Sequence, residues 1–243
     1  TMKILIIRHA DPDYALDSLT EQGWKEAELL AQRISSMDIR SFYVSPLGRA
    51  KDTASLTLKK MQREAEECEW LREFAPSIVR PDREGKSITW DWLPKDWTSV
   101  EEFYHKQQWM EHTAMQGGNV AQEYTWVTAS FDDILARHGY EREGNYYRAV
   151  CSNMDTIVFF CHFGLECVLL SHLIGVSPMV LWHGTCAAPS SVTTLVTEER
   201  RRGIASFRMT SFGDVSHLTA AGRQPSPSAR FCECFANEQE RHD

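Results

Sequence analysis

Cationic and imidazole side chains follow short apolar segments at three places in the sequence. They are Arg8 and His9, Arg49, and His162. A guanidinium group grips two oxygens of a phosphate at once, and a neutral imidazole is a nucleophile that can attack phosphorus. We therefore predict that these four side chains, once brought together, bind a phosphate monoester and expose it to attack by His9.

Three predicted strands would bring these side chains to one edge of a sheet. The apolar run Ile4 to Ile7 predicts a buried strand, and residues 41–44 and 156–161 predict two more. Pro46 after a serine is typical of a helix start, which puts Arg49 just inside that helix. Ligands bind at the carboxyl edge of open α/β sheets, so neighbouring strands would place all four side chains in one pocket.

The motifs around these residues resemble the histidine phosphatase superfamily, whose members share the phosphoglycerate-mutase-like fold. The matching motifs are Arg8-His9-Ala10, Val44-Ser45-Pro46-Leu47-Gly48-Arg49-Ala50, Cys161-His162-Phe163-Gly164, and an ending at Asp214 to Leu218. The resemblance implies His9 as the nucleophile and adds His162 and the two arginines to the catalytic group. It also implies a phosphate site, for which we name Arg8, Arg49, His162 and Phe163.

The family also implies a carboxylic acid that protonates the leaving group, a contribution of about 10² to 10⁴ in rate. We favour Glu73, because Leu71-Arg72-Glu73 is similar to the Leu-x-Glu through which many members supply this acid. The alternatives are Asp11 and Asp13, which lie close to His9 in the sequence. Attack by water on the phosphohistidine would complete the reaction, with inorganic phosphate as the second product.

Other residues are candidates for the substrate pocket or for a metal. We expect Asp11, Tyr14 and His183 in the substrate pocket, because they lie in predicted loops near the carboxyl edge. Two cysteines and a histidine near the end of the chain could suggest zinc, but three scattered ligands on a tail make a poor site. We expect neither a metal nor a cofactor.

Two departures from the family pattern bear on the reaction. Ala10 stands where the family usually has glycine, and its methyl group narrows the approach to phosphate. Residues 11–15 replace the family's Glu-(Ser/Thr)-x-x-Asn, so that a polar phosphate contact is missing. These departures favour a phosphatase. A phosphoglycerate-type mutase and a non-catalytic sensor of a phosphorylated ligand remain the alternatives.

The order of the predicted elements indicates a single α/β domain over residues 1–243. We predict a three-layer α/β/α sandwich with a mostly parallel sheet. The tryptophan-rich segment 75–149 is predicted to be a mainly helical insertion over the active site, with a helix from Thr98 to about Met115. Residues 220–243 are expected to form a loosely held C-terminal tail.

Composition limits the partners and the compartment. The chain has 243 residues, of which 42% are hydrophobic, and a formal net charge of −8, so nucleic acid and anionic membranes are not expected partners. Seven irregularly spaced cysteines and the lack of a long apolar run favour a reducing cytoplasm. We expect a small, partly apolar phosphorylated metabolite as the substrate; composition does not give the oligomeric state.

Overall fold

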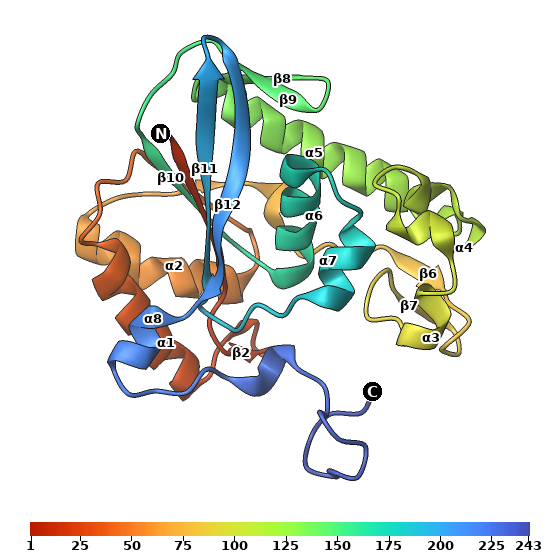
Figure 1. The fold of residues 1–243 in the computed structure, drawn as a ribbon. Helices are drawn as coiled ribbons and strands as arrows, with labels where there is room; N and C mark the ends of the chain where they lie inside the picture. The colour runs from red at the N-terminus through yellow and green to blue at the C-terminus, as the bar shows by residue number, and fades with distance from the viewer.

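An eight-stranded mixed sheet runs through the computed structural model, which describes residues 1–243 (Figure 1). Its order is β5-β4-β10-β1-β11-β12-β9-β8, and the pairs from β5 to β1 are parallel, whereas the other pairs are antiparallel. The strands are β1 (Lys3–Arg8), β4 (Ser41–Val44), β5 (Glu66–Glu67), β8 (Tyr140–Glu143), β9 (Tyr146–Ala149), β10 (Thr156–Cys161), β11 (Val192–Arg201) and β12 (Ile204–Asp214). The predicted fold class is confirmed, with the parallel strands in the half of the sheet that carries the candidate site.

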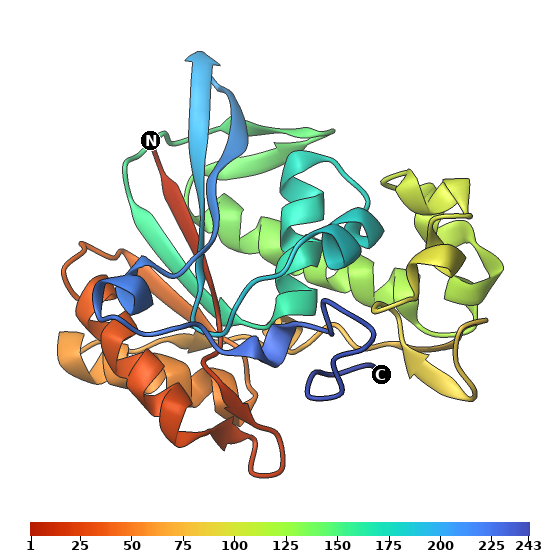
Figure 2. The same ribbon diagram turned by 60° about the horizontal axis from the view of Figure 1, so that its bottom comes forward.

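Helices cover both faces of the sheet and make the three layers (Figures 1 and 2). On one face lie α1 (Glu21–Ile34), α2 (Gly48–Met61) and α8 (Ser216–Ala220). On the other face lie α5 (Val120–Arg137), α6 (Phe163–Ile174) and α7 (Pro178–Gly184). The central strands are buried on both sides, which explains why β1 and β10 are continuous apolar runs rather than alternating ones.

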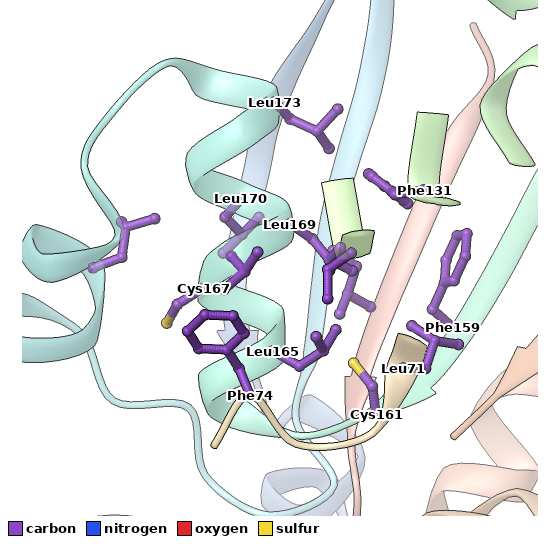
Figure 3. Close-up of a cluster of buried hydrophobic side chains, with 14 of the residues drawn as sticks. Leu71, Phe74, Phe131, Phe159, Cys161, Leu165, Cys167, Leu169, Leu170 and Leu173 are labelled. Atoms are coloured by element: carbon purple, nitrogen blue, oxygen red, sulfur yellow. The ribbon is translucent and has the colours of Figure 1, made fainter. Parts of the chain in front are cut away.

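The alternation of side chains along β1 and β10 separates two hydrophobic clusters. Ile4 and Ile6 of β1 belong to a large cluster with α5 and α6, whereas Leu5 and Ile7 belong to a smaller cluster with α1 and α2. In Figure 3, Phe159 and Cys161 of β10 lie beside the leucines of α6 and Phe131 of α5. Both layers of helices are therefore fixed to the same two strands.

The register of the parallel strands sets the positions of the two motif histidines. Arg8 at the end of β1 pairs with Cys161 at the end of β10. The His9 N–H then donates to the Cys161 carbonyl at 3.0 Å, so the residues that follow both strands are side by side. Because β4 is the next parallel neighbour of β10, the start of α2 reaches the same edge.

The segment 75–149 is mainly helical and shares the large hydrophobic cluster with α6. Its elements before α5 are β6 (Ser77–Val79), β7 (Lys86–Ile88), α3 (Pro94–Trp97), η2 (Glu101–Tyr104), η3 (Gln108–Glu111) and α4 (Thr113–Gln116). After α5, the hairpin of β8 and β9 adds to the antiparallel edge of the main sheet. The last part of the insertion is thus joined to the main sheet through its pairing with β12.

The prediction of one continuous helix from Thr98 to Met115 is wrong, because short turns occupy this stretch. Trp97, Phe103, Trp109 and Met115 are all buried, at intervals of six residues. Six residues are about 1.7 turns of an α-helix, so a continuous helix would point these side chains in different directions. Separate turns divided by extended residues return each of the four to the core.

The segment around His183 was also predicted as a loop, but it ends the helix α7. Ser177 precedes this helix and its hydroxyl accepts a hydrogen bond from the Met179 N–H at 3.2 Å, while Pro178 occupies the first turn. These are ordinary start signals of a helix. The helix matters for the site because it carries His183.

Four further short elements complete the fold. They are β2 (Pro12–Asp13), β3 (Ser18–Leu19), η1 (Glu69–Leu71) and η4 (Pro227–Ala229). One of them, η1, places Trp70 and Leu71 in the large hydrophobic cluster. All seven cysteines are free thiols. None of the helices combines the length and the apolar character that crossing a lipid bilayer requires.

The aromatic packing on β10 gives a test of the fold. Phe159 is fully buried, with its ring centroid 5.0 Å from that of Tyr43 and 5.3 Å from that of Phe131. We expect Phe159→Ala to lower the free energy of unfolding by about 3–5 kcal/mol, because it removes these contacts and leaves a cavity. Phe235→Ala is the matched control, since that ring is 89% exposed. Equal urea midpoints for the two variants would contradict this description of the core.

Candidate active site

The His9 imidazole is held in a single neutral form. Its Nδ1 lies 2.8 Å from the Ala10 carbonyl oxygen, and since a carbonyl only accepts, Nδ1 carries the proton. The pKa of His9 is lowered to about 3, and burial is the largest cause. The Arg8 guanidinium also lowers this pKa, and its effect is larger than that of Arg49. The Nε2 lone pair of the neutral ring is therefore available as a nucleophile.

His162 lies next to His9, with 5.2 Å between the ring centroids. The Ser45 hydroxyl is 2.7 Å from His162 Nε2 and also accepts from the Leu47 N–H at 3.2 Å, so its own proton is directed to the ring. This assigns the His162 proton to Nδ1, a buried nitrogen with no protein partner. His162 therefore keeps one donor for a bound anion.

Ser45 acts differently from the role that the sequence suggested. The helix α2 begins at Gly48 and its preceding residue is Leu47, which makes no side-chain cap. The serine hydroxyl instead orients His162, which is 117 residues away in the chain. Sequence reasoning missed this contact because nothing in the local pattern distinguishes a cap serine from a serine that supports a distant histidine.

Both arginines retain unused donors at the carboxyl edge. Arg8 donates through Nη1 to the Ala187 carbonyl at 2.8 Å, and Arg49 donates through Nη1 to Asp17 Oδ1 at 2.7 Å. The Nε of each guanidinium is buried and has no partner. A buried unpaired donor is costly, so an oxyanion that accepts from these groups would be strongly favoured. The two arginines thus form an anion site beside the two histidines.

Asp17 is a second residue that the sequence analysis did not identify. Its Oδ2 accepts from the Gly48 N–H at 2.6 Å, while its Oδ1 accepts from Arg49 Nη1. It therefore fixes both the start of α2 and the direction of the guanidinium. Its backbone has a φ of +47°, and a Cβ at Gly48 would lie 2.1 Å from its carbonyl oxygen. This tight contact requires glycine at position 48.

The carboxyl group of Glu73, which comes from the segment after η1, lies against the first turn of α6, next to His162. Its Oε1 accepts from the Phe74 and Leu165 N–H groups, both at 2.8 Å, and its Oε2 accepts from the Gly164 N–H at 3.3 Å. Burial raises the pKa of Glu73 to about 6, although these backbone donors stabilise the charged form. Such a carboxyl exchanges its proton near neutral pH, as a general acid or base must.

The two alternative acids lie elsewhere. The Asp11 carboxylate accepts hydrogen bonds from the Thr20 and Ser228 hydroxyls, both at 2.6 Å, and from the Ser226 hydroxyl. Asp13 Oδ1 accepts from the Ala15 and Leu16 N–H groups and closes a turn. The structure does not bring either carboxylate into the substrate cavity. For Asp11, which we expected there, the reason is that three hydroxyls from α1 and the tail hold it.

His183 lines the cavity, where it joins α7 to the insertion. Its Nδ1 donates to the Met179 carbonyl at 2.6 Å, and its Nε2 accepts from the Trp92 N–H at 3.0 Å. Its ring is stacked on Trp97 with 4.8 Å between centroids. Burial lowers the pKa of His183 to about 4, so the ring stays neutral. With both nitrogens engaged, His183 shapes the wall and does no proton transfer.

A cavity of about 840 Å³ opens at this edge of the sheet. Arg8, Tyr14, Glu73 and Phe163 line its catalytic side. Its other walls come from the insertion, from α7 and from the tail, and include Trp90, Asp91, Trp92, Trp97, Trp182, Arg230, Phe231 and Arg241. Only 2% of His9 is exposed, and the Tyr14 ring, which is 62% exposed, lies edge-to-face with the imidazole at 6.5 Å between centroids. Tyr14 therefore borders His9 on the side of the cavity.

The tail is anchored where it passes the site. The Ser226 and Ser228 hydroxyls donate to Asp11, two residues after the nucleophile. Figure 2 shows the tail crossing between the hairpin of β2 and β3 and the insertion. We expected residues 220–243 to be loosely held; in the structure Ser226 and Ser228 are hydrogen-bonded to Asp11, and later residues of this segment line the cavity.

Comparison with known proteins defines the class that this fold and site represent. The family model described as histidine phosphatase superfamily (branch 1) matches residues 4–210. The chain belongs to this superfamily.

Curated relatives fall on both sides of the phosphatase and mutase division. The chain is 26% identical over 224 residues to the mitochondrial serine/threonine-protein phosphatase Pgam5 of Caenorhabditis briggsae, a match that covers 89% of this chain and 64% of that protein. Pgam5 of Drosophila ananassae is 33% identical over 88 residues, covering 32% of this chain and 30% of that protein. The 2,3-bisphosphoglycerate-dependent phosphoglycerate mutase of Thermoplasma acidophilum is 38% identical over 66 residues, covering 23% and 33%. The matches to the Pgam5 proteins span less than two thirds of their length.

Solved structures share the fold at low identity. A mutant phosphoserine phosphatase from Entamoeba histolytica with bound phosphoserine superposes with a TM-score of 0.59 at 21% identity, covering 90% of this chain and all of that one. A mycobacterial glucosyl-3-phosphoglycerate phosphatase complex gives 0.55 at 18% identity, covering 86% and 98%. YhfR of Bacillus stearothermophilus gives 0.56 at 21% identity, covering 89% and 99%.

The protonation of His9 can be tested without any substrate. Burial and the arginines lower the pKa of His9 to about 3, so the ring should remain neutral from pH 7 down to about pH 4, with its proton on Nδ1. Two-dimensional ¹H–¹⁵N spectra of the histidine side chains distinguish the two tautomers and the cation. A His9 that titrates near its ordinary value of 6.5, or that carries its neutral-form proton on Nε2, would contradict the geometry.

Proposed function

We propose that this chain is a phosphomonoesterase that hydrolyses a small phosphorylated metabolite through a phosphohistidine on His9. The observation that carries the proposal is a neutral imidazole with a free Nε2, beside a second histidine and two guanidiniums whose buried Nε donors have no protein partner. A non-catalytic sensor of a phosphorylated ligand would need the arginines to bind the phosphate. It would not need the His9 tautomer to be fixed with Nε2 free for attack.

Substrate binding neutralises the phosphate before the attack. The dianion accepts from the free donors of Arg8 and Arg49 and from Nδ1–H of His162. A pair of opposite charges at 4 Å is worth about 4 kcal/mol at an effective dielectric of 20. The two arginines also disfavour a further positive charge beside them. They therefore keep His9 neutral while they bind the phosphate that it attacks.

The covalent step exchanges one bond to phosphorus for another. His9 Nε2 supplies an electron pair to phosphorus, and the bond from phosphorus to the ester oxygen breaks with its pair going to that oxygen. Glu73, protonated below a pKa of about 6, gives its proton to the leaving alkoxide. The Ala10 carbonyl stabilises the positive ring through the Nδ1 hydrogen bond.

Hydrolysis of the phosphohistidine then restores the site. The Glu73 carboxylate takes a proton from water, the water oxygen bonds to phosphorus, and the bond to Nε2 breaks with its pair returning to the ring. Inorganic phosphate is the product, and Glu73 is protonated for the next cycle. Both proton transfers in this scheme pass through Glu73.

The mutase alternative requires the enzyme to keep the phosphoryl group on His9 until the substrate has changed its orientation in the pocket. Ala10 and the missing polar contact of residues 11–15 weaken that hold, as the sequence suggested. Asp17 adds a negative charge on Arg49, which also weakens the grip on a retained phosphoryl group. Interconversion of 2- and 3-phosphoglycerate without release of phosphate would favour the mutase.

The compartment and macromolecular partners are also proposals. Seven free thiols suit a reducing cytoplasm, and a net charge of −8 disfavours nucleic acid and anionic lipid. Microscopy of the protein expressed in its own cells, with fractionation as a second readout, tests the compartment.

Removal of the nucleophile tests the mechanism. We expect His9→Ala to lower kcat for a generic phosphomonoester by at least about a thousandfold and to abolish an acid-labile, alkali-stable phosphoprotein formed from ³²P-labelled substrate. His105→Ala is the control, because that histidine is exposed and contacts only its own turn. Equal activity of His9→Ala and the control would remove the mechanism.

The pH dependence tests the role of Glu73. Its acid form is needed, and burial places its pKa at about 6, so kcat/KM for alkyl phosphates should fall about tenfold per pH unit as pH rises above 6. Glu73→Gln should lose this dependence and slow alkyl phosphates far more than p-nitrophenyl phosphate, whose leaving group needs no proton. Exposed Glu69→Gln serves as the control. Equal slowing of both substrates by Glu73→Gln would assign the acid to another residue.

A further inference from the structure

Asp91 is a carboxylate in the cavity wall whose hydrogen-bonding capacity is unused. No N–H or O–H group of the chain donates to it, and the nearest cation, Nη2 of Arg241, is 3.8 Å away, beyond hydrogen-bond distance. Its side chain is 28% exposed. Its φ of +64° lies in the left-handed region, which costs a residue other than glycine free energy and recurs at ligand sites. A fixed carboxylate with no cation in direct contact favours a ligand that brings a positive charge.

The residues on either side hold Asp91 in place. The Trp90 indole N–H donates to the Phe74 carbonyl at 2.7 Å, and the Trp92 indole N–H donates to the Thr89 carbonyl at 2.8 Å. Arg80, paired with Asp82 in a buried salt bridge, donates to the Trp90 carbonyl. The position of Asp91 is therefore set by its neighbours and does not depend on contacts of its own carboxylate.

The neighbouring Trp90 connects Asp91 with the catalytic acid. A Cβ added at Gly164 would lie 2.6 Å from Glu73 Oε1 and 2.7 Å from two atoms of the Trp90 ring. The indole thus borders the carboxyl that protonates the leaving oxygen, and Phe163 packs edge-on against it with 6.1 Å between centroids. Glu73, Trp90 and Asp91 line the same cavity, so a leaving group that receives its proton from Glu73 enters a space that Asp91 borders.

A cation of the chain already lies between Asp91 and an aromatic ring. The guanidinium carbon of Arg241 lies 3.9 Å from the centroid of Phe231, while its Nη2 faces Asp91 and its Nε faces Asp243 at 3.8 Å. A carboxylate and an aromatic face are the two components that bind organic cations. Arg241 is 46% exposed and sits near the end of the tail, so a ligand can displace it.

Resting on the phosphatase activity proposed above, we infer that Asp91 binds an alkylammonium group of the substrate. The substrate class is the phosphate monoester of an amino alcohol, with its phosphate at His9 and its cationic nitrogen at Asp91. Arg241 occupies the ammonium position in the free protein and leaves it when the substrate binds. The aromatic walls of the cavity, from Trp90 to Phe231, suit the alkyl groups on such a nitrogen.

Two isosteric substrates test this inference. Choline phosphate and 3,3-dimethylbutyl phosphate have the same shape and differ in the positive charge, and p-nitrophenyl phosphate reports the basal activity. We expect kcat/KM for choline phosphate to exceed that of the neutral ester by about tenfold. Asp91→Asn should bring the ratio near one without changing the neutral ester or p-nitrophenyl phosphate, and Arg241→Ala should raise it. Asp133→Asn, an exposed change of the same charge on α5, should leave the ratio as in the wild type.

Other results would overturn the inference. Equal or faster turnover of the neutral ester by the wild type does so, and so does a charge preference that persists in Asp91→Asn. If the wild type and Asp91→Asn both prefer 3-phosphoglycerate to choline phosphate, the cavity binds anionic leaving groups. Arg83 and Arg241, which line the cavity, would then be their partners. If p-nitrophenyl phosphate is not hydrolysed, the proposed function fails separately. Calorimetric binding of the two esters to His9→Ala and to His9→Ala/Asp91→Asn then still decides the role of Asp91.

Discussion

The parallel pairing of β1 with β10 is the constraint on which the rest of the site depends. It aligns Arg8 with Cys161, so that the two histidines that follow are neighbours with 5.2 Å between their rings. The buried side chains of these two strands fix the register, because a shift by one residue would exchange the two hydrophobic clusters. Chemistry at the carboxyl edge is thus determined by packing in the middle of the sheet.

Burial shifts the pKa values of Glu73 and His9 in opposite directions. It disfavours every charged form, which keeps His9 neutral and raises the pKa of Glu73 to about 6. Arg8 opposes the effect on the Glu73 carboxylate, whereas Arg8 and Arg49 both add to the effect on the imidazole. A single physical cause therefore leaves His9 uncharged and gives Glu73 a proton that it can exchange near neutral pH.

The fold class and the central residues were predictable because each is encoded locally. Strand-ending Arg8, His9 and His162 mark the carboxyl edge by themselves, and the family motifs gave their roles. The support for these residues was not predictable, because Ser45 and Asp17 act on partners that only the folded chain brings near. The turns of 98–115 were missed for another reason: a buried side chain at every sixth residue does not follow the helical period, so the start signal at Thr98 does not continue into a helix.

The way the insertion is attached has a consequence for motion. Its hairpin of β8 and β9 extends the main sheet, and its aromatic side chains share one hydrophobic cluster with α6. It therefore has no hinge about which to swing as a rigid lid. The cavity walls that lie outside this cluster are the tail beyond Ser228 and the hairpin that carries Tyr14. Loop motions in general take nanoseconds to microseconds, so exchange of the cavity's contents past these two segments would not need the slower closure of a domain.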